Sequence, residues 1–239
     1  MTEFTKWRSL VDGAEISTLP DSVENQYLAV DLEDGNIPDR AGIADLLALS
    51  GGGPTKVEDV NAANGATVAR YNGSDQSSQA NVNLSTDKQG VVFTGILRDA
   101  NRGNNQYLIA DGDQELGFDL QDDADEGWDT FRGTSGSSDD RVHNNDGSTS
   151  EIEGELVVIS FVGQNNDSLL LRVNGDEIAP SDNNGSAKNL ETMVVADQPI
   201  FNQYAALDLV ELTTVNESDI DKIQDEETRQ ANEYGVNFD

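Results

Sequence analysis

The chain has 239 residues, in which 46 acidic side chains outnumber 14 basic ones and give a formal net charge of -32. Self-repulsion of this size opposes compaction in dilute buffer, whereas at about 1 M salt the Debye length falls to roughly 3 Å and exposed carboxylates repel little. We therefore interpret the charge as an adaptation to high salt. An acidic surface also repels phosphate, which disfavours binding to nucleic acids and to membrane surfaces.

The sequence shows no targeting or membrane-spanning segment. No apolar run approaches the roughly 18 residues of a membrane span, and the first residues lack the long apolar stretch of a signal peptide. We therefore expect a protein that is made in the cytoplasm and not exported by the ordinary route. The chain has no cysteine, which excludes disulfides and thiolate metal sites.

Residues 1–26 stand apart from the rest of the chain. Four apolar side chains have helical spacing there: Phe4, Trp7, Leu10 and Val11. We interpret residues 1–26 as an attachment segment, with the alternative that they form a strap on their own domain. Residues 27–239 are then one further domain, which suits the length of the chain.

From about residue 66, short apolar runs alternate with polar turns, which indicates an all-β sandwich rather than a parallel α/β sheet. Eight strands are predicted, over residues 67–71, 91–97, 106–110, 115–120, 156–161, 169–173, 190–195 and 205–212. Between Gln121 and Ser150 the sequence predicts a long acidic loop that contains Trp128 and Phe131.

The last part of the chain predicts one helix. Asn216 and Ser218 each offer an N-cap with an acidic residue three positions further on, and Gly235 is a natural stop. An interrupted apolar face lies between them: Ile220, Ile223, Ala231 and Tyr234.

Three stretches resemble laminin-G-like and concanavalin-A-like domains. They are residues 37–75, with an acidic turn, an apolar run and a strand before Asn-Gly-Ser-Asp; residues 169–178, with an Asn-Gly hairpin; and residues 205–223, like a closing strand and helix. The resemblance covers most of residues 27–239 and implies a jelly-roll sandwich. The opening from Phe4 to Gly13 is similar to that of structural proteins from tailed viruses of halophilic archaea.

The resemblance implies a lectin-like protein that meets its ligand outside a cell, yet no export signal is present. We therefore predict a surface structural protein of a virion, such as a tail fibre, spike or capsid turret, assembled in the host cytoplasm and then released. Expected partners are other virion proteins, further copies in a trimer or pentamer, and a host-surface glycan or glycoprotein. Neither nucleic acid nor membrane insertion is expected. The alternative is a secreted or cell-associated carbohydrate-binding module of a halophile.

The binding candidates are aromatic and apolar residues. Trp128 and Phe131 are predicted to contact a receptor or glycan, because aromatic rings are typical binding anchors, with the alternative that they hold their loop on the sandwich. Attachment to the particle is assigned to the four apolar residues of the amino-terminal segment: Phe4, Trp7, Leu10 and Val11.

A calcium ion is the one cofactor that the sequence suggests, because hard oxygen ligands suit calcium and the folds resembled here often hold one. The candidate ligands are Asp111, Asp113, Asp123 and Asp125. None of these stretches matches an EF-hand loop.

Glu151, Glu153 and Glu155 alternate just before a predicted strand, so on extended backbone they would share one face, about 6.6 Å apart in steps. Paired carboxylates near this distance hydrolyse glycosides. Three acidic residues in a chain this acidic are more often a solvated face, and the one histidine, His143, excludes any site that needs two. We therefore predict that the chain is not an enzyme, with a glycoside hydrolase as the least favoured alternative.

Overall fold

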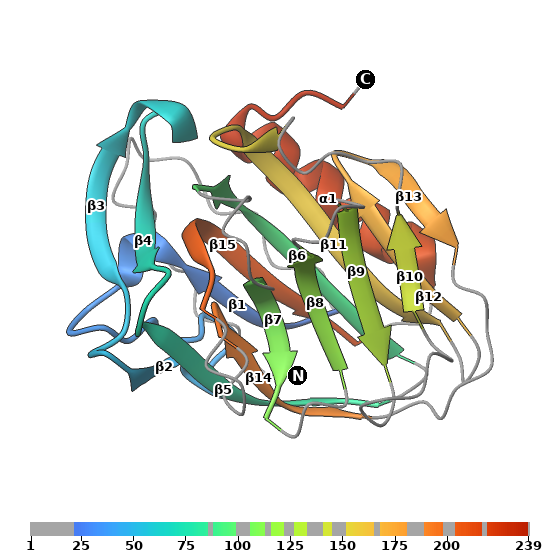
Figure 1. Ribbon diagram of the computed structural model, residues 1–239, viewed down its shortest axis with the longest axis horizontal. Helices are drawn as coiled ribbons and strands as arrows, with labels where there is room; N and C mark the ends of the chain where they lie inside the picture. The colour runs from blue at the N-terminus through green and yellow to red at the C-terminus, as the bar shows by residue number, and fades with distance from the viewer. Residues whose placement is uncertain are drawn as a thin grey trace, which may run out of the picture.

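The computed structural model describes residues 22–85, 88–98, 106–112, 116–121, 127–132, 141–144, 152–164, 168–180, 189–197, 204–216 and 219–238. They form two antiparallel sheets that face one another, with one α-helix on the outside (Figure 1). The all-β sandwich predicted from the sequence is confirmed. Phe4, Trp7, Leu10 and Val11 lie outside the described residues.

The larger sheet has eight strands. They are β1 (Val23–Leu28), β3 (Thr55–Val60), β4 (Ala66–Asn72), β6 (Lys88–Leu97), β11 (Leu156–Gln164), β12 (Ser168–Val173), β13 (Asp176–Pro180) and β15 (Ala206–Val215). Their order is β13-β12-β11-β6-β15-β4-β3, and β1 pairs with the second half of β15. Residues 23–26 therefore belong to the sandwich, although the sequence analysis assigned them to the attachment segment.

The smaller sheet has seven strands. They are β2 (Leu47–Ser50), β5 (Ser77–Leu84), β7 (Gln106–Asp111), β8 (Leu116–Gln121), β9 (Gly127–Arg132), β10 (Arg141–Asn144) and β14 (Leu190–Val195). Their order is β10-β9-β8-β7-β14-β5-β2. Strands β9 and β10 lie within the stretch that the sequence assigned to one long loop, so that prediction was wrong there. Polar and acidic residues interrupt the alternation of apolar and polar side chains by which a strand is identified from sequence.

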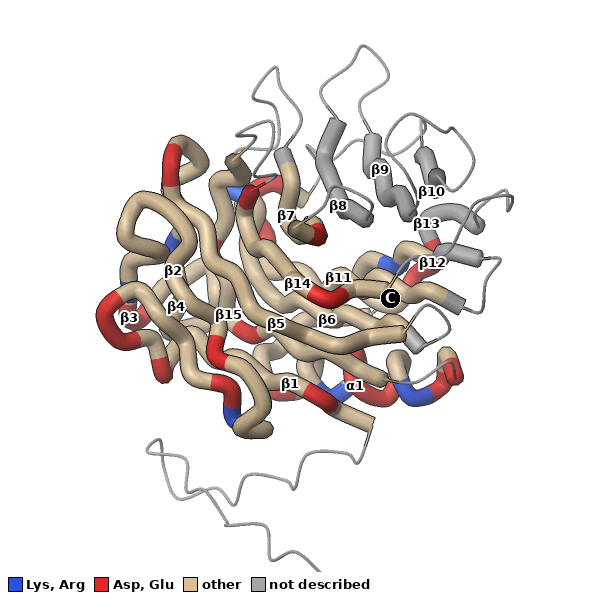
Figure 2. The backbone as a smooth tube through the Cα atoms, turned by 90° about the horizontal axis from the view of Figure 1, so that it is seen from below, with Lys and Arg blue, Asp and Glu red and all other residues tan. Residues whose placement is uncertain are grey.

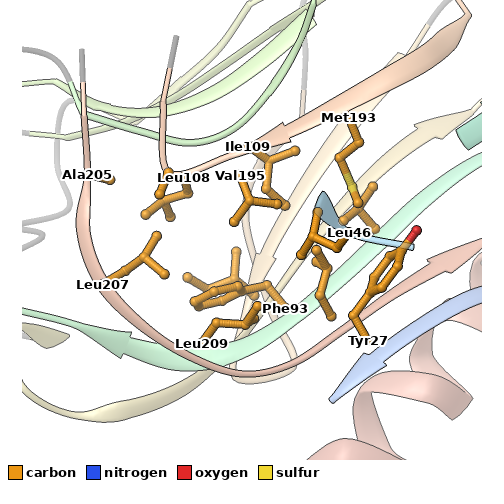
Figure 3. Close-up of a cluster of buried hydrophobic side chains, with 14 of the residues drawn as sticks. Tyr27, Leu46, Phe93, Leu108, Ile109, Met193, Val195, Ala205, Leu207 and Leu209 are labelled. Atoms are coloured by element: carbon orange, nitrogen blue, oxygen red, sulfur yellow. The ribbon is translucent and has the colours of Figure 1, made fainter. Parts of the chain in front are cut away.

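The core lies between the two sheets, where apolar side chains of both inner faces meet (Figure 3). Phe93, Leu207 and Leu209 come from the larger sheet, whereas Ile109 and Val195 come from the smaller one. All five are buried. Each such side chain contributes about 1.5–3 kcal/mol by leaving water, so this layer holds the sheets together.

Helix α1 (Ile220–Tyr234) covers the outer face of the larger sheet, where it packs on β6, β11 and β15 (Figure 1). Its N-cap is Asp219, whose side chain accepts a hydrogen bond from the Asp221 N–H (3.0 Å), and not Asn216 or Ser218 as predicted. The predicted stop is confirmed, because Gly235 has a left-handed backbone (φ 71°). With the helix on its outer face and the core on its inner face, β15 is buried along its whole length.

The hairpin predicted around Asn174 and Gly175 is also confirmed. It joins β12 to β13, and both residues have positive φ (50° and 87°), as a two-residue turn that fits the strand twist requires. The described residues include no helix long and apolar enough to span a membrane.

Candidate functional site

The structure places the predicted contact residues Trp128 and Phe131 on strand β9. In the pairing with β10, Trp128 lies opposite Asn144 and Phe131 lies opposite Arg141. His143, expected in a loop, is also part of β10. Strands β9 and β10 thus extend the smaller sheet beyond β8, and the contact role of the two aromatic residues stays a prediction.

The predicted calcium ligands are only partly described. Asp111 ends β7 and is buried, whereas Asp113, Asp123 and Asp125 lie outside the described residues. In the part of the chain that the structure describes, no group of three or more His, Cys, Asp or Glu side chains is arranged to hold a metal ion. The calcium site therefore stays a prediction.

The row of glutamates before β11 is not extended. Glu151 lies outside the described residues, but Glu153 and Glu155 flank a turn at Gly154, which has φ +80°. The Gly154 N–H donates to the Leu97 carbonyl (2.8 Å) and holds the turn against β6. The expectation that these glutamates line one face of an extended strand is therefore wrong for Glu153 and Glu155.

A surface that the sequence analysis missed lies on the outer face of the smaller sheet. In β5, Ala80, Val82 and Leu84 are buried in the core, and the side chains that alternate with them are amides. Asn81 and Asn83 are exposed. Because successive residues of a strand face opposite sides, the amides form a row along the outer face.

Strands on both sides of β5 continue this row. Leu47 of β2 lies opposite Gln79 and is 49% exposed, and Leu49 is 39% exposed. On β14, Thr192 lies opposite Asn81, and its hydroxyl is 3.5 Å from the amide oxygen of Asn81.

These side chains make up what we call the neutral face: Leu47, Leu49, Gln79, Asn81, Asn83 and Thr192. Figure 2 shows β5 in tan along its whole length, whereas acidic positions are spread over much of the remaining described chain. The two exposed leucines and four uncharged polar residues thus form a patch that differs from its acidic surroundings.

Asp39 supports the loop that leads into β2. Its buried carboxylate accepts five hydrogen bonds at 2.8–3.1 Å, from the backbone N–H groups of Gln26, Ala41, Ile43 and Ala44 and from the side-chain amide of Asn25. A carboxylate that accepts this many hydrogen bonds holds its loop in one conformation. If the loop moved, each broken bond would leave a polar group without a partner.

Further bonds attach the same loop to β1 and to the edge of β2. The Tyr27 hydroxyl donates to the Ala44 carbonyl (2.8 Å), and burial raises the pKa of this phenol, with Asp39 and Asp45 acting in the same direction. Tyr27 therefore stays protonated as a donor. At the other end, the side-chain oxygen of Asn36 accepts from the backbone N–H of Ala48 (2.8 Å). Strand β2, which carries Leu47 and Leu49 of the neutral face, is thus attached to a loop that many hydrogen bonds hold in place.

Five arginines have described side chains, and each of the five pairs with a carboxylate. Their ion pairs are Arg40 with Asp31, Arg70 and Arg98 with Asp208, Arg172 with Glu227, and Arg229 with Glu211 and Glu226. These five arginines thus neutralise carboxylates of the same chain.

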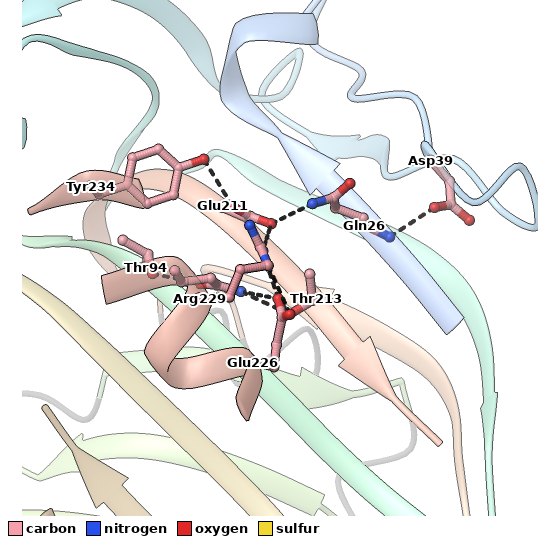
Figure 4. Close-up of polar contacts among 9 residues, drawn as sticks. Gln26, Asp39, Thr94, Glu211, Thr213, Glu226, Arg229 and Tyr234 are labelled. Carbon is pink, nitrogen blue, oxygen red and sulfur yellow. Dashed lines mark hydrogen bonds and ion pairs between the residues drawn. The ribbon is translucent and has the colours of Figure 1, made fainter. Parts of the chain in front are cut away.

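The most deeply buried ion pairs lie between α1 and the larger sheet (Figure 4). Arg229 bridges Glu226 on the helix and Glu211 on β15, and both carboxylates are buried. Glu211 also accepts from the Tyr234 hydroxyl (2.8 Å) and from the side-chain amide of Gln26 (2.6 Å). Burial raises the pKa of Glu211, and the positive charge of Arg229 opposes that rise. This network of ion pairs and hydrogen bonds holds α1 on the larger sheet and is therefore structural.

No protein-family model and no curated protein matches the chain. Among solved structures, the fold is similar to the receptor binding domain of botulinum neurotoxin C/D mosaic serotype, with a TM-score of 0.65 and 12% identity over 88% of this chain and 52% of that one. It is also similar to the binding domain of Paraclostridial Mosquitocidal Protein 1, with a TM-score of 0.60 and 13% identity over 89% of this chain and 53% of that one.

A third similar structure is a sialidase of Trypanosoma rangeli, with a TM-score of 0.60 and 12% identity over 91% of this chain and 34% of that one. The chain therefore spans about half, or less, of the length of the structures it matches. At these identities the likeness shows the fold alone, which is a jelly-roll β-sandwich.

Proposed function

We propose that this chain is a non-enzymatic receptor-attachment protein on the surface of a virion, as part of a tail fibre, spike or capsid turret. The observation that carries the proposal is the likeness of its sandwich, over 88% of the chain, to a receptor binding domain. Because one fold serves many functions, the surface chemistry of this chain has to support the same role.

The proposed ligand is a glycan or glycoprotein of the host surface. We assign the contact to Trp128 and Phe131 on β9, since aromatic side chains supply much of the binding energy at interfaces. Because the two residues are three positions apart on a strand, they belong to opposite faces of the sheet, so one of them makes the contact and a double variant removes either. The net charge of -32 favours a receptor without a high negative charge.

The proposed setting is a virus of a host that lives in high salt. The net charge of -32 supports this setting, because concentrated salt screens the repulsion between carboxylates. In this proposal the amino-terminal segment, with Phe4 and Trp7, attaches the sandwich to other virion proteins. The protein is then assembled in the host cytoplasm and acts outside the cell.

Cell binding tests the receptor part of the proposal. The labelled full-length chain is expected to bind host cells in high salt, and the double variant Trp128→Ala/Phe131→Ala is expected to bind at least about tenfold more weakly, because loss of an anchor costs about 2 kcal/mol or more. Val30→Ala, at an exposed position outside the neutral face and outside β9, serves as the control with unchanged binding. If the aromatic double variant bound cells as tightly as the wild type, the assignment of the contact to Trp128 and Phe131 would be wrong.

Mass spectrometry of purified particles tests the virion part. The chain is expected in particles at a defined stoichiometry. Its presence only as free protein in the medium would instead favour a carbohydrate-binding module of a halophile.

A further inference from the structure

We infer that the neutral face is a contact surface for a second copy of this chain, with two smaller sheets stacked face to face about a twofold axis. This contact goes beyond receptor binding and does not depend on it. A twofold contact produces a dimer, which also differs from the trimer or pentamer that the sequence analysis predicted.

The first argument is electrostatic. Residues 46–55 and 76–86, which contain β2 and β5, carry no charged side chain, although 25% of the whole chain is charged. Two copies with a net charge of -32 each repel one another, so a contact costs least where neither copy places a carboxylate. On the neutral face β2 and β5 meet this condition, whereas the exposed Glu191 of β14 lies next to Thr192 and marks the border of the contact.

The second argument is that the chemistry of this face is complementary to itself. Each amide of Gln79, Asn81 and Asn83 has both donor and acceptor groups, so it is able to pair with an amide of an identical copy. Leu47 and Leu49 are exposed in the single chain and would pack against their counterparts. A row of carboxylates or of ammonium groups has no such ability to pair with itself.

The third argument comes from the two sides of the sandwich. The outer face of the larger sheet is already covered by α1 (Figure 1). The neutral face, by contrast, has exposed side chains. The open edge of β2 is not the contact, because the side chain of Asn36 occupies the Ala48 N–H and the strand pairing shifts between Ala48 and Ser50. The remaining way to use β2 is through its face.

The fourth argument is preorganisation. The loop before Leu47 is held by the five hydrogen bonds to Asp39, so little further ordering is needed when a partner binds. The patch is nevertheless small, which predicts a weak dimer that forms at high protein concentration.

Analytical ultracentrifugation of the full-length chain tests the inference. With rising concentration at about 1 M NaCl, the average mass is expected to rise from that of one chain, 25.7 kDa, towards twice this value. At about 0.1 M NaCl the dimer is expected to be weaker, because less screening leaves more repulsion between the copies. A contact made of ion pairs would show the opposite salt dependence.

Substitutions locate the contact. Leu47→Glu is expected to weaken the dimer by at least about tenfold, because it places like charges opposite one another across the twofold axis. Asn81→Asp is expected to weaken it as well, whereas the matched change Asn232→Asp, at an exposed position of α1, is expected to leave it unchanged. Unchanged circular dichroism would show that each variant is folded.

Three results would overturn the inference: a monomer at every concentration and salt, a trimer or pentamer that Leu47→Glu does not affect, or equal effects of Asn81→Asp and Asn232→Asp. The cell-binding experiment remains separate. A monomer that binds cells would contradict the dimer contact and support the attachment function. A dimer that binds no cells would support the dimer contact and contradict the attachment function.

Discussion

Replacing Arg229 by alanine is expected to destabilise the protein by about 3–5 kcal/mol, since removing one partner of a buried ion pair leaves a buried charge without compensation. Glu211 on β15 and Glu226 on α1 would both remain buried without their counter-charge. Urea unfolding at constant NaCl, followed by circular dichroism, measures the loss. Lys222→Ala, at an exposed position of the same helix, is the control and is expected to change the free energy of unfolding by less than about 0.5 kcal/mol.

The loss in the free energy of unfolding caused by Arg229→Ala, called the deficit below, is also expected to depend on pH. Burial raises the pKa of Glu211 in the folded protein above its ordinary value of 4.5, so its protonated form favours folding. That contribution is fully present below the ordinary pKa and is lost as the pH rises through the raised one. Without Arg229 the pKa rises further, so the deficit should be largest at neutral pH and should shrink as the pH falls towards 4.5. A deficit independent of pH would contradict this account.

Asp39→Asn is expected to destabilise the protein by about 3 kcal/mol, although the two side chains have nearly the same shape. One carboxylate oxygen of Asp39 accepts from Asn25, Ile43 and Ala44. The other accepts from Gln26 and Ala41. In Asp39→Asn one of these oxygens is replaced by an NH₂ group, which donates hydrogen bonds and cannot accept them. The N–H groups that donated to that oxygen would then have no acceptor.

The matched control is Asp34→Asn, at an exposed position of the neighbouring turn. It makes the same chemical change and is expected to leave the urea midpoint unchanged. Equal midpoints for Asp39→Asn and the wild type would show that the loop is held by other bonds. Hydrogen exchange adds a local measurement, because the amides of Ile43 and Ala44 should lose protection in Asp39→Asn.

The sequence predicted most reliably those strands that are buried on both faces. β6 and β11 are nearly continuous apolar runs, and such runs identify a strand without knowledge of its neighbours. The Asn174 and Gly175 turn and the stop at Gly235 were equally readable, because their positive φ angles require particular residue types.

Strands without a continuous apolar run were harder to find. β5 alternates Ala80, Val82 and Leu84 with amides, and β9 carries acidic and small residues between its aromatic ones, so neither resembles an apolar run. Their strand character comes from pairing with neighbours that are distant in the sequence. β5, for example, lies between β2 and β14.

The sequence by itself determined the fold class, the positions of the apolar core strands such as β6 and β11, the closing helix and the excess of negative charge, since these follow from composition and from local periodicity. Only the tertiary structure decided which residues act together. The register of the smaller sheet places Leu47 opposite Gln79 and Thr192 opposite Asn81, and the docking of α1 places Arg229 on Glu211. No local signal specifies such pairs, because strand register and helix packing depend on the burial of the whole core.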